Sequence, residues 1–119
     1  MQEIVAVVKS ANDKGRRLRV LGSGHSWSPV AASSDLLLSL INYNGVVAMD
    51  ERRMTVTVKG GTRLSQISAA LSERGFALSI LPSVSSQTIA GAIATGAVCM
   101  CVCCVCVSCE YVCCVGVLV

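Results

Sequence analysis

Residues 22–29 read GSGHSWSP, and this loop decides how the rest of the chain is interpreted. Gly22 and Gly24 bracket Ser23, and glycine lets a backbone approach a ligand closely. Consecutive amide groups in such a turn can form an anion-binding concavity that suits a pyrophosphate, to which Ser23 and Ser26 add hydroxyl donors. The spacing matches neither the dinucleotide fingerprint G-x-G-x-x-G nor a phosphate loop with its lysine. The sequence of the loop is therefore compatible with a plain turn as well as with an anion-binding site.

His25, within this loop, is the only histidine of the chain. A lone loop histidine is most often an exposed or hydrogen-bonding residue, and it cannot form a metal site with other imidazoles. A Ser-His-Asp triad would need a nucleophile that the sequence does not single out. By itself, His25 can act as a nucleophile through a neutral ring nitrogen beside a bound electrophilic cofactor. Both roles stay open on chemistry alone.

Regular elements flank the loop. Upstream, apolar residues recur at helical spacing over 2–13, and Gly15 follows where a helix C-terminal glycine is expected. Residues 18–21 then predict a short strand. Downstream, the near-continuous apolar run at 36–41 predicts a buried strand.

A hairpin and a second helix come next. Residues 46–49 and 54–58 are predicted to form the two strands of the hairpin, because apolar residues in the second strand alternate with Thr and Lys. Thr62 is a candidate N-cap for the helix that follows, and Gly75 ends it. The apolar face of that helix carries Leu64, Ile67 and Leu71. The order helix, strand, strand, hairpin, helix predicts an α+β fold.

A segment of small residues closes this part of the chain. Residues 82–87 are polar and turn-like, and residues 88–96 read TIAGAIATG. Small side chains let a backbone lie close to another surface. That surface is either a neighbouring helix or a flat ligand, and the sequence leaves both open.

Residues 97–119 have a different composition, because all eight cysteines of the chain lie between Cys99 and Cys114. Their spacings suit neither separated zinc-binding pairs nor a disulfide framework with turn-forming spacers, so we predict no metal site. The length is sufficient for a membrane span, but Glu110 would be costly inside it. Alternating Val and Cys is also what a translated GT dinucleotide repeat gives. We favour read-through of such a repeat over a membrane segment, and predict domain limits of 1–96 and 97–119.

The overall composition excludes several classes of protein. Hydrophobic residues make up 53%, which is incompatible with a disordered chain. A net charge of +3 and four aromatic residues argue against a dedicated nucleic-acid binder. Residues 1–8 contain Glu3 and lack the basic start of a signal peptide, so none is expected.

The stretch RVLGSGHSWSPV at 19–30 resembles the pyrophosphate-binding loop of FAD-linked oxidases with a PCMH-type, vanillyl-alcohol-oxidase-like flavin domain. The likeness is greatest to the aldonolactone oxidase branch, which includes L-gulonolactone, D-arabinonolactone and alditol oxidases. It extends over residues 1–96 and leaves out 97–119. Further matching segments, in family order, are EIVAVVKSA at 3–11, TVTVKGGTRLSQISAAL at 55–71 and ERGFALSILPSVSSQTIAGAIATG at 73–96.

The resemblance implies the first, N-terminal subdomain of a PCMH-type FAD-binding domain, with FAD as cofactor. Backbone amides around the loop would hold the FAD diphosphate, and His25 matches the histidine that many members bond to the flavin 8α-methyl carbon. Trp27 and Pro29 would stiffen the end of the loop. The loop residues are Gly22, Ser23, Gly24 and Ser26, and those that would pack against the flavin and its diphosphate are Thr88, Gly91 and Gly96.

The chain also departs from the family pattern. After Gly96 the family continues with Thr-His-Gly, whereas here Ala97 and Val98 follow. We expect the rest of the flavin domain and the substrate-binding cap to lie outside this chain, which would then have no oxidase activity alone. The first reading is a fragment of an FAD-dependent oxidase of a sugar-lactone or polyol CH–OH group, using O2 or another acceptor. The second is a non-catalytic remnant of the FAD-binding module, tethered to a membrane by residues 97–119.

Overall fold

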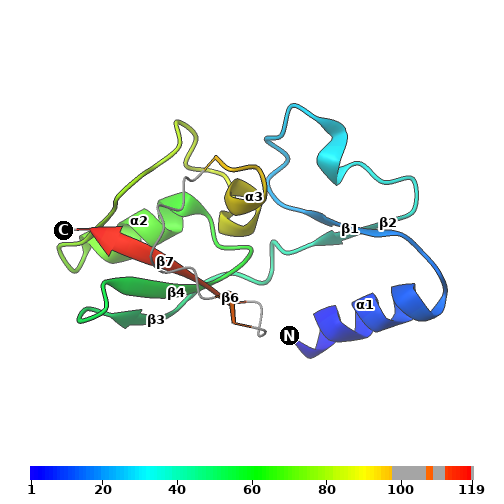
Figure 1. Ribbon diagram of the computed structural model, residues 1–119, viewed down its shortest axis with the longest axis horizontal. Coiled ribbons are helices and arrows are strands. Elements are labelled where there is room, and N and C mark those ends of the chain that lie inside the picture. The colour runs from blue at the N-terminus through cyan, green and yellow to red at the C-terminus, as the bar shows by residue number, and fades with distance from the viewer. Residues whose placement is uncertain (98–106, 109–111, 119) are drawn as a thin grey trace.

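The computed structural model describes residues 1–97, 107–108 and 112–118. Helices and strands are mixed along the chain, as the α+β prediction requires (Figure 1). The molecule is elongated, with extents of 47 × 30 × 24 Å. The elements are α1 Gln2–Asp13, β1 Leu18–Leu21, the 3₁₀ turn η1 Pro29–Ala31, β2 Leu36–Ser39, β3 Val46–Asp50, β4 Thr55–Lys59, α2 Leu64–Ser72, β5 Ala77–Leu78, α3 Ile89–Ala94, β6 Val107–Ser108 and β7 Val112–Leu118.

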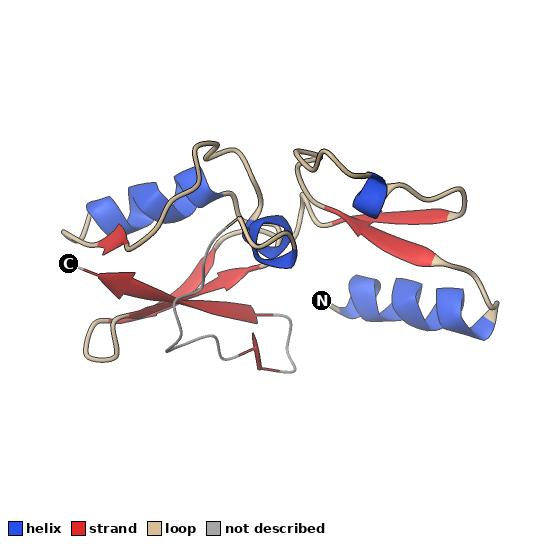
Figure 2. Cartoon of the chain, turned by 45° about the horizontal axis from the view of Figure 1, so that its top comes forward, coloured by secondary structure: helices blue, strands red, loops and turns tan. Residues whose placement is uncertain are grey.

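The first group of elements holds α1, β1, η1 and β2 side by side (Figures 1 and 2). The bounds predicted for α1 and β1 are confirmed, and Gly15 follows the helix with a φ of +62°. Strands β1 and β2 are parallel, so the connection that contains loop 22–29 must cross from one end of the pair to the other. This crossing directs the loop toward the second group.

Strand β2 is not the buried strand that its apolar run predicts. It ends at Ser39, and its side chains alternate between half-buried and exposed. Leu37 is 52% exposed, and Ile41, beyond the strand, is 58% exposed. Among the described residues β2 pairs only with β1. A parallel strand is buried only where other elements cover both faces of its sheet. The side chain of Leu37 is left open, which explains why the prediction was wrong.

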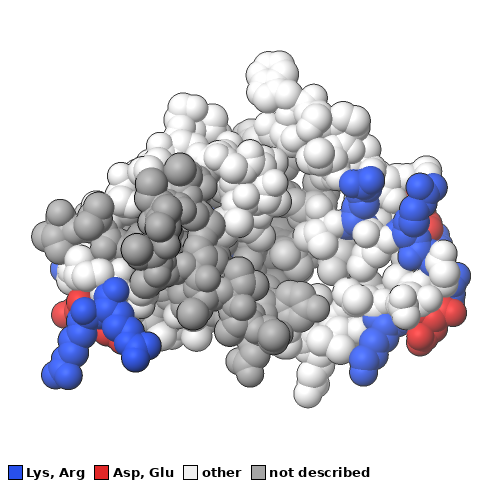
Figure 3. Space-filling model, viewed as in Figure 1, with Lys and Arg blue, Asp and Glu red and all other residues white. Residues whose placement is uncertain are grey.

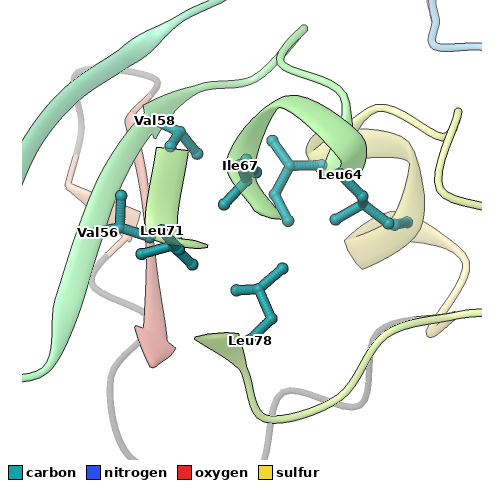
Figure 4. Packing of buried hydrophobic residues seen from close by; sticks show 8 residues of the cluster. Val56, Val58, Leu64, Ile67, Leu71 and Leu78 are labelled. Atoms are coloured by element: carbon teal, nitrogen blue, oxygen red, sulfur yellow. The ribbon is translucent and has the colours of Figure 1, made fainter. Parts of the chain in front are cut away.

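The second group is a sheet with the strand order β3-β4-β7-β5, on which α2 and α3 pack (Figure 2). The predicted hairpin is confirmed: β3 and β4 are antiparallel. Its turn is stabilised by Asp50, whose carboxylate accepts hydrogen bonds from the N–H groups of Arg52 and Arg53. The buried core, part of which Figure 4 shows, consists of Val56, Val58, Leu64, Ile67, Leu71, Leu78, Ile89 and Ala92.

Thr62 does not cap α2 as predicted, because Arg63 occupies the N-cap position. The Thr62 side chain is fully buried. Its hydroxyl donates to the carbonyl oxygen of Lys59 at 2.6 Å and accepts from the N–H of Gly45 at 2.9 Å. Thr62 therefore ties the end of β4 to the segment that precedes β3.

Strand β7 pairs antiparallel with both β4 and β5. Its backbone is thus part of the sheet that contains β4. The other expectations concern the whole of residues 97–119, of which 98–106, 109–111 and 119 lie outside the described residues, and they stay predictions. In the described part of the chain, no helix is both long enough and apolar enough to cross a membrane. The domain boundary after Gly96 stays a prediction.

Candidate FAD site

Loop 22–29 meets the start of α3 at a close backbone contact. A Cβ atom added to Gly22 would lie 2.5 Å from the Oγ1 atom of Thr88 and 3.7 Å from the Cα atom of Gly91. The first distance is too short for a non-bonded contact, so a larger residue here would force the loop and α3 apart. The structure therefore brings together three of the residues that the resemblance singles out.

Two hydrogen bonds hold the same loop to residue 86. The Ser23 hydroxyl donates to the carbonyl oxygen of Ser86 at 2.7 Å. The Oγ atom of Ser86 lies 2.7 Å from Nε2 of His25. Ser86 belongs to the polar, turn-like stretch at 82–87, and the sequence pattern alone predicts no role for it. Its position inside the segment SSQTIAGAIATG was the only available signal.

The serine hydroxyls of the loop are engaged within the protein. The Ser23 proton is directed to Ser86, and the Oγ atoms of Ser26 and Ser28 are 3.2 Å apart. Donation from Ser23 to a phosphate, as the sequence predicts, would require its bond to Ser86 to break. Only one hydroxyl of the Ser26–Ser28 pair donates in that contact, so the other hydroxyl and the backbone amides of the loop are the candidate donors to a phosphate.

The outer part of the loop is exposed. Gly24 has a φ of +72°, a conformation that glycine adopts without strain, and a Cβ there would meet no neighbour within 4 Å. His25 is exposed on the same side. Trp27 is fully exposed and so cannot stiffen the end of the loop by packing, contrary to our expectation. Pro29 instead begins η1, where its restricted φ suits a helical first turn.

Helix α3 is held in place by its apolar residues and by backbone bonds. Ile89 and Ala92 are buried in the core. The N–H groups of Ile89 and Ala90 donate to the carbonyl oxygens of Thr62 and Gly60, at 2.8 and 3.1 Å. A Cβ on Gly60 would lie 3.4 Å from that of Ala90. The small residues of this segment therefore allow close packing against other backbone segments of the same chain.

Gly96 is not part of this contact. It lies at the opposite end of α3 from Thr88, has a φ of +67°, and donates its N–H to the carbonyl oxygen of Ile93 at 3.1 Å. Its conformation is that of a glycine that ends a helix. Any role of Gly96 toward a flavin stays a prediction.

A cavity of about 120 Å³ lies beside the contact between the loop and α3. Arg63 lines it and makes no ion pair with any described residue, so its positive charge is available to an anion. Arg63 was not among the predicted site residues, although it lies shortly after Gly60 and Gly61 in a segment that resembles the family. The lining residues are Gly22, Ser23, Ile41, Asn44, Gly61, Arg63, Gln66 and Thr88.

Gly61 allows this cavity to close on one side. A Cβ on Gly61 would overlap the carbonyl oxygen of Leu40 and lie 2.7 Å from that of Tyr43. The N–H of Gly61 donates to the Tyr43 carbonyl at 2.9 Å. This close contact places the segment after β2 against the residues that precede α2. Ile41 and Asn44 of that segment line the cavity together with Gly61.

Charged side chains on the face shown in Figure 3 gather toward the two ends of the long axis. At the end that carries α1 and β1, Arg16 forms an ion pair with Asp35, and the N–H of Arg17 donates to the same carboxylate at 2.8 Å. The hydrogen bond from Arg16 is the main cause that holds the pKa of Asp35 below its ordinary value. This pair joins the residues before β1 to the residue before β2, and so holds the far end of the crossing, where β2 begins, beside the start of β1.

Comparisons with known proteins agree with this geometry. A family model described as an FAD binding domain matches residues 1–119, which includes the Val/Cys segment that the sequence resemblance left out. D-arabinono-1,4-lactone oxidase of Eremothecium gossypii is 40% identical over 97 residues, which are 78% of this chain and 18% of that protein. L-gulonolactone oxidase of Scyliorhinus torazame is 33% identical over 95 residues, 80% of this chain and 22% of that protein.

The fold is shared with cholesterol oxidase from B. sterolicum. The TM-score is 0.70 at 24% identity, over 78% of this chain and 19% of that one. The chain thus spans about a fifth of the length of the relatives that it matches. The family match and the shared fold agree with the resemblance of loop 22–29 and of residues 85–96. The chain belongs to the family of FAD binding domains, and its cofactor is FAD.

Proposed function

We propose that this chain forms one wall of the FAD site of an oxidoreductase that oxidises the CH–OH group of a sugar lactone or polyol, with O2 or another acceptor. The observation that carries the proposal is the junction of loop 22–25 with residues 86–91, beside a cavity lined by Arg63, which forms no ion pair within the part of the chain that the structure describes. The substrate class rests on the names of the relatives, of which this chain spans about a fifth. None of the comparisons supports the membrane-tethered remnant.

The residues of the cavity fit the diphosphate of FAD. A diphosphate is an anion that needs donors and positive charge, and Arg63 supplies both. Glycine at positions 22 and 61 leaves backbone, without side chains, along two sides of the cavity. A volume of about 120 Å³ is well below the ~300–1,000 Å³ of a complete ligand pocket. The cavity would therefore hold one group of the cofactor, and further protein would enclose the remainder.

His25 is the residue that we propose for contact with the flavin ring. Its imidazole is exposed and its Nε2 atom is held by Ser86, so the ring is accessible and oriented. When bound, FAD accepts the hydride that leaves the substrate carbon. The part of this chain is to hold the cofactor and, through His25, to fix it by a covalent bond to the 8α-methyl carbon. That bond would replace a C–H bond of the methyl group; the proton would pass to solvent, and the electron pair would reduce the flavin ring, which O2 or another acceptor would reoxidise.

Titration of the 119-residue chain with FAD, followed by flavin fluorescence, tests the diphosphate assignment. Arg63→Ala should weaken binding about 10- to 100-fold, because it removes a charge-assisted hydrogen bond of roughly 1.5–3 kcal/mol. Arg52→Ala, which removes an equal charge from the exposed turn between β3 and β4, is the matched control. Equal weakening by both variants would mean that only net charge matters, and would contradict the assignment.

His25→Ala in the longer protein that contains this chain tests the covalent bond. Acid-precipitated wild-type protein should keep its yellow flavin, whereas the variant should release it and still bind FAD reversibly. Wild-type protein that releases all of its flavin on acid treatment would refute the bond without affecting the FAD site. The 119-residue chain alone should produce no peroxide from lactones or polyols above a protein-free control.

A further inference from the structure

Among the described residues, Ser86 is the one whose side chain and backbone both form hydrogen bonds with the loop. Its Oγ atom is 2.7 Å from His25 Nε2, and its carbonyl oxygen accepts the hydroxyl of Ser23 at 2.7 Å. These partners lie 61 and 63 residues away in the sequence. The double contact fixes the loop on both sides of Gly24.

The backbone around Ser86 is itself anchored to the start of α2. The carbonyl oxygen of Ser85 accepts from the N–H of Ser65 at 2.9 Å, and that of Gln87 accepts from the N–H of Leu64 at 3.0 Å. Leu64 is buried in the core. Backbone hydrogen bonds of its two neighbours, Ser85 and Gln87, therefore fix the position of Ser86. A fixed position allows Ser86 to orient the exposed imidazole ring of His25.

We propose that Ser86 is a positioning residue for His25, which holds the Nε2–H tautomer of the imidazole and leaves the lone pair of Nδ1 available. The inference rests on the proposed role of His25 toward FAD, and adds the residue that sets its orientation and tautomer. A neutral imidazole has one donor and one acceptor nitrogen, and the hydrogen bond made by one nitrogen determines the state of the other.

The direction of the hydrogen bond follows from the chemistry that His25 would perform. A serine hydroxyl can donate or accept, so two arrangements fit the observed 2.7 Å separation. If Ser86 donated to Nε2, the proton would reside on Nδ1 and neither nitrogen would have a free lone pair. If Ser86 accepts from Nε2–H, the Nδ1 lone pair is free on the other side of the ring. Only the second arrangement gives a nucleophile.

Nitrogen NMR of the 119-residue chain without FAD tests this directly, because His25 is the only histidine and gives a single imidazole. The protein would carry ¹⁵N-labelled histidine and be measured near pH 8.5, where an ordinary imidazole is neutral. The wild-type spectrum should be dominated by the Nε2–H tautomer. In Ser86→Ala both ring nitrogens should shift toward the values of a free imidazole, and Ser86→Thr, which keeps a hydroxyl, should restore the wild-type pattern.

Ser85→Ala is the matched control, because it removes a neighbouring hydroxyl for which the described residues offer no hydrogen-bond partner, and it should leave the spectrum unchanged. A spectrum that is the same in wild type and Ser86→Ala, or a wild-type protein with the proton on Nδ1, overturns the proposal. FAD titration of the longer protein that contains this chain separates the two ideas. A longer protein that fails to bind FAD, while the 119-residue chain shows the Ser86-dependent tautomer, refutes the proposed function and supports the positioning contact. A longer protein that binds FAD, while the spectrum of the chain shows no dependence on Ser86, refutes the positioning contact alone.

Discussion

Replacing Gly22 by alanine tests the contact between the loop and α3. The added methyl group would lie 2.5 Å from Thr88 Oγ1, roughly 1 Å inside a comfortable non-bonded distance. Thr88 is only 7% exposed and cannot turn away freely, so the loop and α3 must separate. Forced contacts of this kind destabilise proteins by about 1–3 kcal/mol. We expect Gly22→Ala to lower the free energy of unfolding by that amount.

A double-mutant cycle with Thr88→Ala isolates the cause. Removing Oγ1 leaves the new methyl 3.7 Å from Gly91 Cα and 3.8 Å from the Cβ of residue 88, which are ordinary contacts. Thr88→Ala alone should cost about 0.5–1 kcal/mol, since its N-cap bond to Gly91 N–H is long, at 3.4 Å. In that background Gly22→Ala should cost less than about 0.5 kcal/mol, which gives a coupling energy of about 0.5–3 kcal/mol.

Urea unfolding followed by circular dichroism gives the free energy of unfolding of the wild-type 119-residue chain, the two single variants and the double variant. Equal m-values would show that the four proteins unfold between comparable states. Gly24→Ala is the control: its φ of +72° makes it costly, but it has no neighbour within 4 Å, so its cost should be the same with and without Thr88. If Gly22→Ala is equally destabilising in both backgrounds, the argument from close contact is wrong.

Three further predictions concern the core, the wall of the cavity and the charge pair. Ile67→Ala, in the fully buried core, should lower the free energy of unfolding in urea by about 2–5 kcal/mol, whereas Ala69→Gly on the exposed face of α2 should cost about 1 kcal/mol. Gly61→Ala should destabilise more than Gly60→Ala in the same assay, because only the first forces a methyl group onto a carbonyl oxygen. Because the pKa of Asp35 is lowered on folding, its ionised form stabilises the protein above its ordinary pKa of 3.8, and this contribution is lost as the pH falls through the lowered value. Unfolding measured between pH 7 and pH 2 should show less acid sensitivity in Asp35→Asn than in wild type, and an unchanged pH profile would contradict the assignment.

The local elements were predictable because their signals lie within a few residues of one another. The helix at 2–13 has its apolar spacing and its terminal Gly15 in one short stretch, and the strand at 18–21 and the hairpin arms carry comparable patterns. The loop from Gly22 to His25 could also be picked out, because glycine spacing and a family resemblance coincide there. The periodicity of apolar residues indicates which side of a helix or strand is apolar. It predicts burial correctly only where another element packs against that side.

The partners themselves were not predictable. The exposure of β2 depends on which elements cover the faces of its sheet, and the role of Thr62 depends on Gly45, which the hairpin brings beside it. The same holds at the site, where Ser86 and Arg63 approach the loop from distant parts of the sequence, in which the family resemblance is the only signal. Sequence patterns determined the helices, the hairpin and the loop, because backbone preferences and side-chain spacing are local. Tertiary structure alone decided which hydroxyl holds His25 and which cation faces the cavity, because a hydrogen bond across 61 residues depends on how the whole chain packs.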